Sequence, residues 1–285
     1  MQRVWIAGTL RGMIRRRIDD RWLLFTQDDH ARLSGALAER LGNDAFAAPD
    51  ESARRGIALH DAGWPLHDDQ PTLNPDGKPL DVFETPRDIA LEVWTASARR
   101  ATAADPYAGL LVSLHALSLS AYAVSLDQSR PEQQSTRTRF AMNQFQHAQI
   151  ELQESLRKRL GLRTDRPLTL GLDEGSSDPR EQKLAFDFRL LQAMDQLSLN
   201  LLCTEPPAPA MKIHPRPGQP LHEVTFHRIG SHRATLRPWP FASDSISVEI
   251  PCRVLPAEVF AGNEAFRRAF AQSPREQVAF ALTPC

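Results

Sequence analysis

The chain has 285 residues, of which 41% are hydrophobic and 24% charged, and its formal net charge is −1 at pH 7. This length permits one large domain or two smaller ones, and the composition is ordinary for a globular protein. The balanced charge excludes the strong global field that attracts nucleic acid polymers or anionic membranes. We therefore expect a small-molecule partner, and neither a nucleic acid polymer nor a membrane.

The cysteines and the hydropathy pattern bear on the compartment. The 3 cysteines, Cys203, Cys252 and Cys285, are widely spaced and form no CxxC pair, which favours a reducing compartment over a disulfide framework. No apolar run reaches the roughly 20 residues of a membrane-spanning helix, and no signal-peptide pattern is evident. We expect a cytoplasmic protein. Met13, where patterned sequence begins, is a candidate initiator.

Two short strands and a helix open the patterned sequence. The segments 14–17 and 22–26 contain β-branched and aromatic residues around an acidic turn, which predicts a pair of strands. Leucines then recur every four positions over 31–41, which predicts a helix with one apolar face. Asp28 or Asp29 is a suitable N-cap, so His30 lies in the first turn.

More helices follow, and one of them is apolar nearly all round. The predicted helices share apolar residues at three- and four-residue spacing: 51–61, 86–103, 106–122, 131–160 and 179–203. The helix over 106–122 has apolar residues on nearly every face, so we expect it to be central and buried. The segment 65–85 is rich in Pro, Asp and Gly and reads as a long loop, which in a compact domain is more often functional than filler.

After Cys203 the pattern changes from helices to strands. A proline-rich connector over 205–220 precedes segments with strand character, at 222–229, 232–237, 246–254 and 278–280, and a helix over 256–273. We therefore predict an α+β protein. Its mainly helical bundle spans 27–203, and a small antiparallel β accessory part, built from 13–26 and 204–285, packs on that bundle.

Histidines and aspartates lie on several of the predicted helices, each with an apolar face. They are His30, the adjacent pair His60-Asp61, His115 and Asp195. At a helix end both members of the pair can bend toward one ion. A buried unpaired carboxylate costs several kcal/mol, so Asp195, between leucines, needs a cation, hydrogen-bond donors or a metal. Imidazole and carboxylate ligands suit a divalent ion: Mn, Fe, Zn, Co or Ni.

Each of these residues also has a structural interpretation. Asp195 could be a capping or arginine-paired carboxylate at the rim of a bundle, His115 a hydrogen-bonded core histidine, and His30 a solvent-facing residue. A second pair, His67-Asp68, with Asp69 beside it, falls in the 65–85 segment. There it would line the mouth of a site or simply be solvated.

The order of these residues resembles the HD superfamily of metal-dependent phosphohydrolases. That superfamily is named for a helix-borne His-Asp pair, and an upstream His and a late Asp complete one metal site. The resemblance matches His30 to the upstream His, His60-Asp61 to the pair and Asp195 to the late Asp. His115 would match the further His of members that hold two metals. The resemblance to the HD superfamily implies an all-α core and a site for a divalent metal ion.

A closer resemblance covers almost the whole chain. It is to an uncharacterised bacterial family of unknown function, and it is carried by four stretches: 26–35, 60–64, 105–115 and 195–199. That likeness implies no known activity.

The resulting functional prediction is a phosphohydrolase-like protein that acts on a small phosphorylated or nucleotide substrate. His30, His60, Asp61, His115 and Asp195 are the candidate metal ligands. Asp61, orienting the attacking water or bridging two ions, and His115, at a second ion or the substrate, are the candidate catalytic residues. Two alternatives remain open: a metal-free binding or regulatory protein on the same scaffold, and a di-iron oxygenase with the same ligand order.

Overall fold

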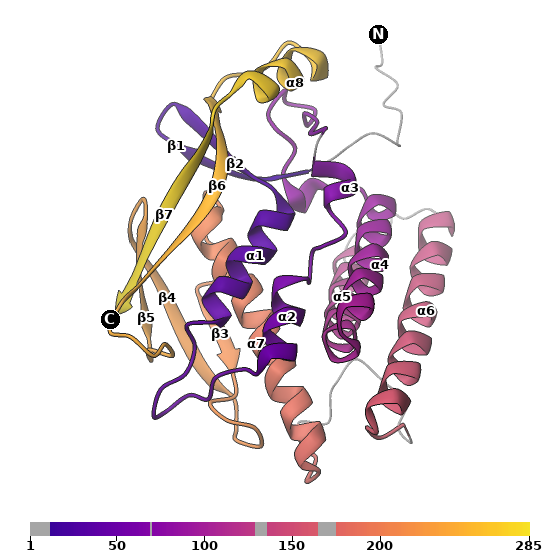
Figure 1. The fold of residues 1–285 in the computed structure, drawn as a ribbon. Helices are drawn as coiled ribbons and strands as arrows, with labels where there is room; N and C mark the ends of the chain where they lie inside the picture. The colour runs from indigo at the N-terminus through magenta and orange to yellow at the C-terminus, as the bar shows by residue number, and fades with distance from the viewer. Residues whose placement is uncertain (1–11, 69, 129–135, 165–174) are drawn as a thin grey trace.

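The computed structural model describes residues 12–68, 70–128, 136–164 and 175–285, and Figure 1 gives their arrangement. The helices are α1 (Gln27–Ala38), α2 (Glu51–Ala58), α3 (Pro65–Asp68), α4 (Arg87–Ala104), α5 (Pro106–Gln128), α6 (Thr136–Leu160), α7 (Pro179–Leu202) and α8 (Asn263–Gln272), with a 3-10 turn η1 (Val82–Glu84). The strands are β1 (Ile14–Ile18), β2 (Arg21–Phe25), β3 (Ala210–Ile213), β4 (His222–Gly230), β5 (Arg233–Arg237), β6 (Ile246–Pro256) and β7 (Arg275–Pro284).

All of these strands belong to one sheet of mixed direction. Its 7 strands follow the order β1-β2-β6-β7-β5-β4-β3. Every neighbouring pair is antiparallel except β5 and β7, which run parallel. The N-terminal hairpin joins the C-terminal strands where β2 pairs with β6, with Trp22 opposite Leu255. Residues from both ends of the chain therefore build one continuous sheet.

This sheet corrects the predicted fold class. The protein is α+β, but strands make up 22% and helices 49% of it, and the sheet is curled and mixed. The expectation of a mainly helical bundle with a small antiparallel β part is wrong. Strand β3 lies inside the segment interpreted as a connector, and β7 spans 10 residues where only 278–280 were expected. The prolines that flank β3 and the polar residues at the start of β7 obscured the alternation that marks a strand.

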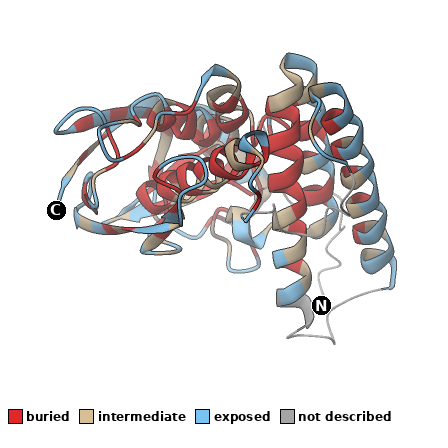
Figure 2. Cartoon of the chain, turned by 90° about the horizontal axis from the view of Figure 1, so that it is seen from below, coloured by how far each residue is buried: buried red, intermediate tan, exposed pale blue. Residues whose placement is uncertain are grey.

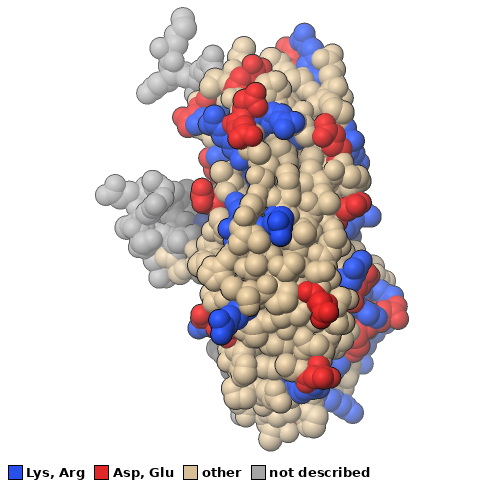
Figure 3. Space-filling model, turned by 90° about the vertical axis from the view of Figure 1, so that its left-hand side faces the viewer, with Lys and Arg blue, Asp and Glu red and all other residues tan. Residues whose placement is uncertain are grey.

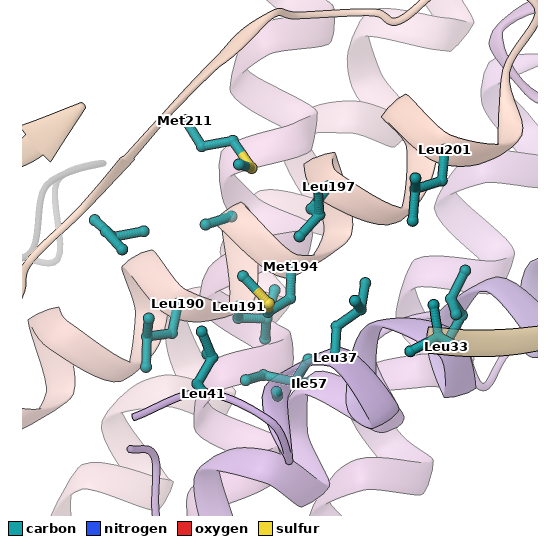
Figure 4. Packing of buried hydrophobic residues seen from close by; sticks show 14 of the residues in the cluster. Leu33, Leu37, Leu41, Ile57, Leu190, Leu191, Met194, Leu197, Leu201 and Met211 are labelled. Atoms are coloured by element: carbon teal, nitrogen blue, oxygen red, sulfur yellow. The ribbon is translucent and has the colours of Figure 1, made fainter. Parts of the chain in front are cut away.

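The central core lies between the sheet and helices α1, α2 and α7. Figure 4 shows Leu37 of α1, Ile57 of α2 and Met194 of α7 meeting there, and all three are at most 1% exposed. The same apolar cluster continues through Val248 of β6 and Leu282 of β7. Each fully buried leucine or isoleucine contributes roughly 2 kcal/mol. The helices and the sheet therefore share one hydrophobic core.

Helices α4, α5 and α6 form an outer layer on the side of α2 and α7 away from the sheet (Figure 1). Figure 2 shows buried residues on the inner faces of the helices and exposed residues along the outermost one. Within the described residues, α5 is the one helix long and apolar enough to cross a membrane, but 67% of its apolar window is buried in this fold. It is the central helix predicted from its composition, as found in cores of water-soluble proteins.

The surface of the sheet side carries charges of both signs. On the face shown in Figure 3, Lys and Arg alternate with Asp and Glu, and uncharged residues cover most of the area. Two predictions lie outside the described residues: the start of the helix predicted over 131–160 and the segment that precedes Met13, apart from Gly12.

Candidate metal centre

Four separate elements bring the predicted ligands together. His30 lies in the first turn of α1, which Thr26 caps by accepting a hydrogen bond from the Asp29 N–H. His60 and Asp61 follow α2 directly, in the turn after its last residue. The other two ligands lie inside long helices, His115 in α5 and Asp195 in α7. The predicted helix over 51–61 is thus shorter, and its end lets both members of the pair face the same point.

The donor atoms of four of these residues form a tight cluster. His30 Nε2 lies 3.0 Å from Asp195 Oδ1 and 3.2 Å from His60 Nε2. The Asp61 carboxylate lies 3.9 Å from His30 Nε2 and 3.6 Å from His60 Nε2, and Asp195 Oδ1 lies 3.5 Å from His60 Nε2. Two atoms bound to one ion at about 2.1 Å lie about 3 to 4 Å apart. These separations therefore match a single ion between His30, His60, Asp61 and Asp195.

Hydrogen bonds on the far side of each ring fix how the two histidines face this cluster. His60 Nδ1 lies 2.8 Å from the Ile57 carbonyl oxygen, which can only accept, so Nδ1 carries the proton. His30 Nδ1 lies 2.7 Å from Ser198 Oγ, and Ser198 in turn contacts the Asp195 carbonyl oxygen at 2.8 Å. With Nδ1–H donating, each ring offers an Nε2 lone pair to the centre. This is the usual outer-shell arrangement of metal-binding histidines.

The two Nε2 atoms therefore need a positive charge between or beside them. Two lone pairs 3.2 Å apart repel each other, and both rings are almost fully buried. A cation satisfies both, or one ring takes a second proton. Burial opposes that proton, but the Asp61 and Asp195 carboxylates outweigh burial and raise the pKa of His60 to about 9. Burial likewise favours neutral Asp195, but His115, His30 and His60 hold the pKa of Asp195 well below its usual value.

His115 occupies the opposite side of the Asp195 carboxylate. Its Nε2 lies 3.4 Å from Oδ2, whereas Oδ1 faces His30 and His60. His60, His115 and Asp195 form a second group whose donor atoms all lie within 4.8 Å of one another, beside the group of His30, His60 and Asp61. Asp195 is thus placed to bridge two positions through its two oxygens.

His30 and Asp195 do not lie where their structural interpretations would place them. His30 is 1% exposed and does not face solvent, and the carboxylate of Asp195 meets three histidines inside the fold. His115 is a buried residue of α5, and its Nδ1 has no hydrogen-bond partner among the described residues. The second pair, His67-Asp68, belongs to α3 instead of an irregular loop.

Supporting residues hold the His-Asp turn in place and were not identified from the sequence. The Gly63 N–H donates to Ser97 Oγ of α4 at 2.8 Å, and Arg100 of the same helix donates to the Ala62 carbonyl oxygen. A Cβ at Gly63 would lie 2.1 Å from the Val93 carbonyl oxygen, so only glycine fits. Gly63 therefore allows the turn to lie in close contact with α4.

The serines behind His30 do carry a sequence signal. Ser34 follows His30 by four residues on α1, and Ser198 follows Asp195 by three on α7, so each serine shares a helix face with a ligand. The two hydroxyls lie 2.9 Å apart. Small polar residues at this spacing from a candidate ligand therefore mark the outer shell of the site.

Comparison with known proteins identifies a family but no characterised relative. No curated protein and no solved structure matches the chain. A family described as "protein of unknown function (DUF3891)" matches residues 13–257, which include every residue of the cluster. The chain therefore belongs to the DUF3891 family of proteins of unknown function.

Proposed function

We propose that this protein binds a divalent metal ion between His30, His60, Asp61 and Asp195 and hydrolyses a small phosphorylated or nucleotide substrate there. One observation carries the proposal: the Nε2 atoms of His30 and His60 lie 3.2 Å apart with their lone pairs turned inward, and each lies 3.0 to 3.9 Å from oxygens of Asp61 and Asp195. Mixed nitrogen and oxygen donors suit Mn, Fe, Zn, Co or Ni.

Each residue has a chemical task in this reaction. A bound divalent cation lowers the pKa of water and polarises a phosphoryl oxygen. His30 and His60 supply neutral nitrogen ligands, held by the Ser198 hydroxyl and the Ile57 carbonyl oxygen. Asp61 and Asp195 supply negative charge, and Asp61 orients the attacking water. His115 sits beyond Asp195, where it contacts the substrate or a second ion.

The likeness to the HD superfamily enters here as part of the proposal. It rests on the ligand order, an upstream His, a His-Asp pair and a late Asp, and on helices as the source of these side chains. The large mixed sheet is no part of that likeness. A bacterial origin and a cytoplasmic location belong to the same proposal, and the free cysteines Cys203, Cys252 and Cys285 agree with a reducing compartment.

Two other functions each have a specific observation in their favour. The second donor group, His60, His115 and Asp195, leaves room for two ions that share Asp195, as a di-iron oxygenase requires. The raised pKa of His60 lets a protonated imidazole take the place of a metal, which favours a metal-free binding or regulatory protein. An iron chromophore together with oxygen consumption would distinguish the di-iron oxygenase from the hydrolase. Ligand binding without turnover would distinguish the metal-free binding or regulatory protein from the hydrolase.

The direct test is turnover of phosphate esters by metal-loaded protein. We expect hydrolysis of p-nitrophenyl phosphate that a chelator abolishes and one of the named metals restores. The His115→Ala variant should lose most of the activity and keep the ion of the four-residue cluster. Metal-loaded protein that hydrolyses no phosphate ester would contradict the hydrolase proposal.

A further inference from the structure

Asp68 of α3 is a buried carboxyl group that the fold does not satisfy. The residue is 7% exposed, and neither carboxylate oxygen makes a hydrogen bond of normal geometry within the described residues, although the backbone N–H groups of Gln27 and Asp28 lie nearby. Gln27, the first residue of α1, is 1% exposed, and its side-chain nitrogen also lacks a partner. Buried polar groups in proteins nearly always have partners, and leaving one without costs free energy. Such a group is typical of a place that a ligand completes.

Asp68 lines a cavity beside the first turn of α1, the turn that also carries His30. The cavity has a volume of about 230 Å³, and its walls include Thr26, Asp28 and Asp29 at the start of α1. The metal ligand His30 follows Asp29 directly in the same helical turn. Arg253 of β6 and Arg275 of β7 line the other side, and Arg275 Nη2 contacts Asp29 at 2.9 Å. Arg253 donates to the Ser273 carbonyl oxygen at 2.6 Å, so two positive charges lie at the rim, each held by a contact with the fold.

Short turns tie Asp68 to the His-Asp pair. The Trp64 N–H donates to the Asp61 carbonyl oxygen at 3.1 Å, and the N–H groups of His67 and Asp68 donate to the Trp64 carbonyl oxygen at 2.7 and 3.0 Å. Trp64 is 3% exposed, so this connection is held by packing. In Figure 1, α3 lies beside the upper end of α1, where His30 begins the cluster. The position of Asp68 relative to Asp61 is therefore fixed.

The surroundings keep Asp68 protonated at neutral pH. Burial is the main cause that raises the pKa of Asp68 to about 8; the backbone N–H groups of Asp28 and Gln27 lower it, and the charges of Asp28 and Asp61 add to the rise. The titratable and charged groups around it are Asp28, Asp29, Asp61, Arg253, Arg275 and His67, the last 3.6 Å from Glu92 of α4. A neutral carboxylic acid can donate a hydrogen bond to an anion that a carboxylate would repel.

We propose that Asp68 is the general acid of the metal centre and protonates the leaving oxygen of a phosphate ester bound in the adjoining cavity. This inference rests on the proposed hydrolase function. A water oxygen forms the new bond to phosphorus, and the bond between phosphorus and the leaving oxygen breaks with its electron pair. The proton of Asp68 goes to that oxygen, and the carboxylate regains a proton released by the attacking water. The products are phosphate and an alcohol.

A first test needs neither metal nor substrate. The amide of Asp68→Asn has the shape of the neutral acid but never ionises, so the two proteins should differ least in stability at about pH 4 and below, where Asp68 is largely protonated in both the folded and the unfolded wild type. As the pH rises from about 4 to about 8, the unfolded wild type releases a proton that the folded protein retains, so D68N should become progressively the more stable protein. The control is Asp187→Asn, since Asp187 is also buried but accepts from Tyr107 Oη at 2.7 Å and pairs with Lys183. D187N should be the less stable protein at both pH values. A D68N protein that melts below the wild type across this range would overturn the proposal.

A second test uses two esters that differ in the need for an acid. Phenoxide is a poor leaving group and p-nitrophenoxide a good one, so D68N should slow hydrolysis of phenyl phosphate by roughly 100-fold and of p-nitrophenyl phosphate far less. Metal content should stay at the wild-type value. If D68N slows both esters equally or neither, the acid role is wrong while the hydrolase stands. If the wild type hydrolyses neither ester, the proposed function fails and the acid role fails with it.

Discussion

His30 and His60 face each other through Nε2 because their Nδ1 atoms are engaged elsewhere. The Ser198 hydroxyl and the Ile57 carbonyl oxygen hold the two rings, and both rings are almost fully buried. The carboxylates of Asp61 and Asp195 add negative charge to the same point. At the scale of single residues the centre is therefore pre-organised, with outer contacts that orient every nitrogen donor except His115.

Removal of the Ser198 hydroxyl should weaken metal binding without unfolding the protein. In Ser198→Ala, His30 Nδ1 loses its acceptor, and loss of such an outer contact typically lowers metal affinity by roughly 10- to 100-fold. Isothermal titration with Zn²⁺ or Mn²⁺ measures the effect. Ser34→Ala is the matched control, because Ser34 contacts the Ser198 hydroxyl and the His30 carbonyl oxygen but no ring atom. An unchanged affinity in S198A would show that the hydroxyl does not orient His30.

The turn after α2 is the element on which the centre depends. The sequence predicted a helix that ends at this turn, and it also placed His60 and Asp61 next to each other at that helix end. What the sequence did not predict is how the turn is anchored to α4 through Ser97 and Arg100. Contacts between elements far apart in the chain leave no periodic pattern, so local reasoning finds the ligands but misses what holds them.

Gly63→Ala should destabilise the protein through this anchoring contact. The new methyl group would lie 2.1 Å from the Val93 carbonyl oxygen, so α4 or the turn must move, and such overpacking typically costs about 1 to 3 kcal/mol. Chemical denaturation measures the loss. Gly230→Ala is the control, because the nearest atom to a Cβ there is 3.8 Å away. Equal stability of G63A and G230A would contradict the close packing of the turn against α4.

The whole molecule is organised around one sheet and one apolar core. The sequence predicted most helices, the α+β class and the residues that meet in the cluster, because amphipathic helices and isolated polar residues in apolar stretches are local signals. It did not predict the size of the sheet. Strand pairing such as β2 with β6 joins residues more than 200 positions apart, and β3 has only 4 residues in a proline-rich segment. Neither the partner of a strand nor its register is encoded in local periodicity.

The shared core predicts that the helical segment 27–203 does not fold alone. Without the sheet, α1 and α7 would expose apolar residues that now pack on β3, β4 and β6, among them Leu197 and Leu37. We expect an isolated 27–203 fragment to lack dispersed amide NMR signals and a cooperative thermal transition, while the full chain unfolds in one transition. A cooperatively folded fragment would instead favour a helical part that is independent of the β part.

The measurement that tests the central claim most directly is the metal content of the full chain and of a variant without the His-Asp pair. Protein stripped by a chelator and titrated with Mn²⁺, Fe²⁺, Co²⁺, Ni²⁺ or Zn²⁺ should bind at least one ion per chain with high affinity. The double variant His60→Ala, Asp61→Ala should bind none while its circular dichroism stays that of the wild type, and His147→Ala, which removes an exposed histidine of α6, should bind as the wild type does. A wild type that binds no ion, or a double variant that binds as tightly as the wild type, would contradict the metal centre.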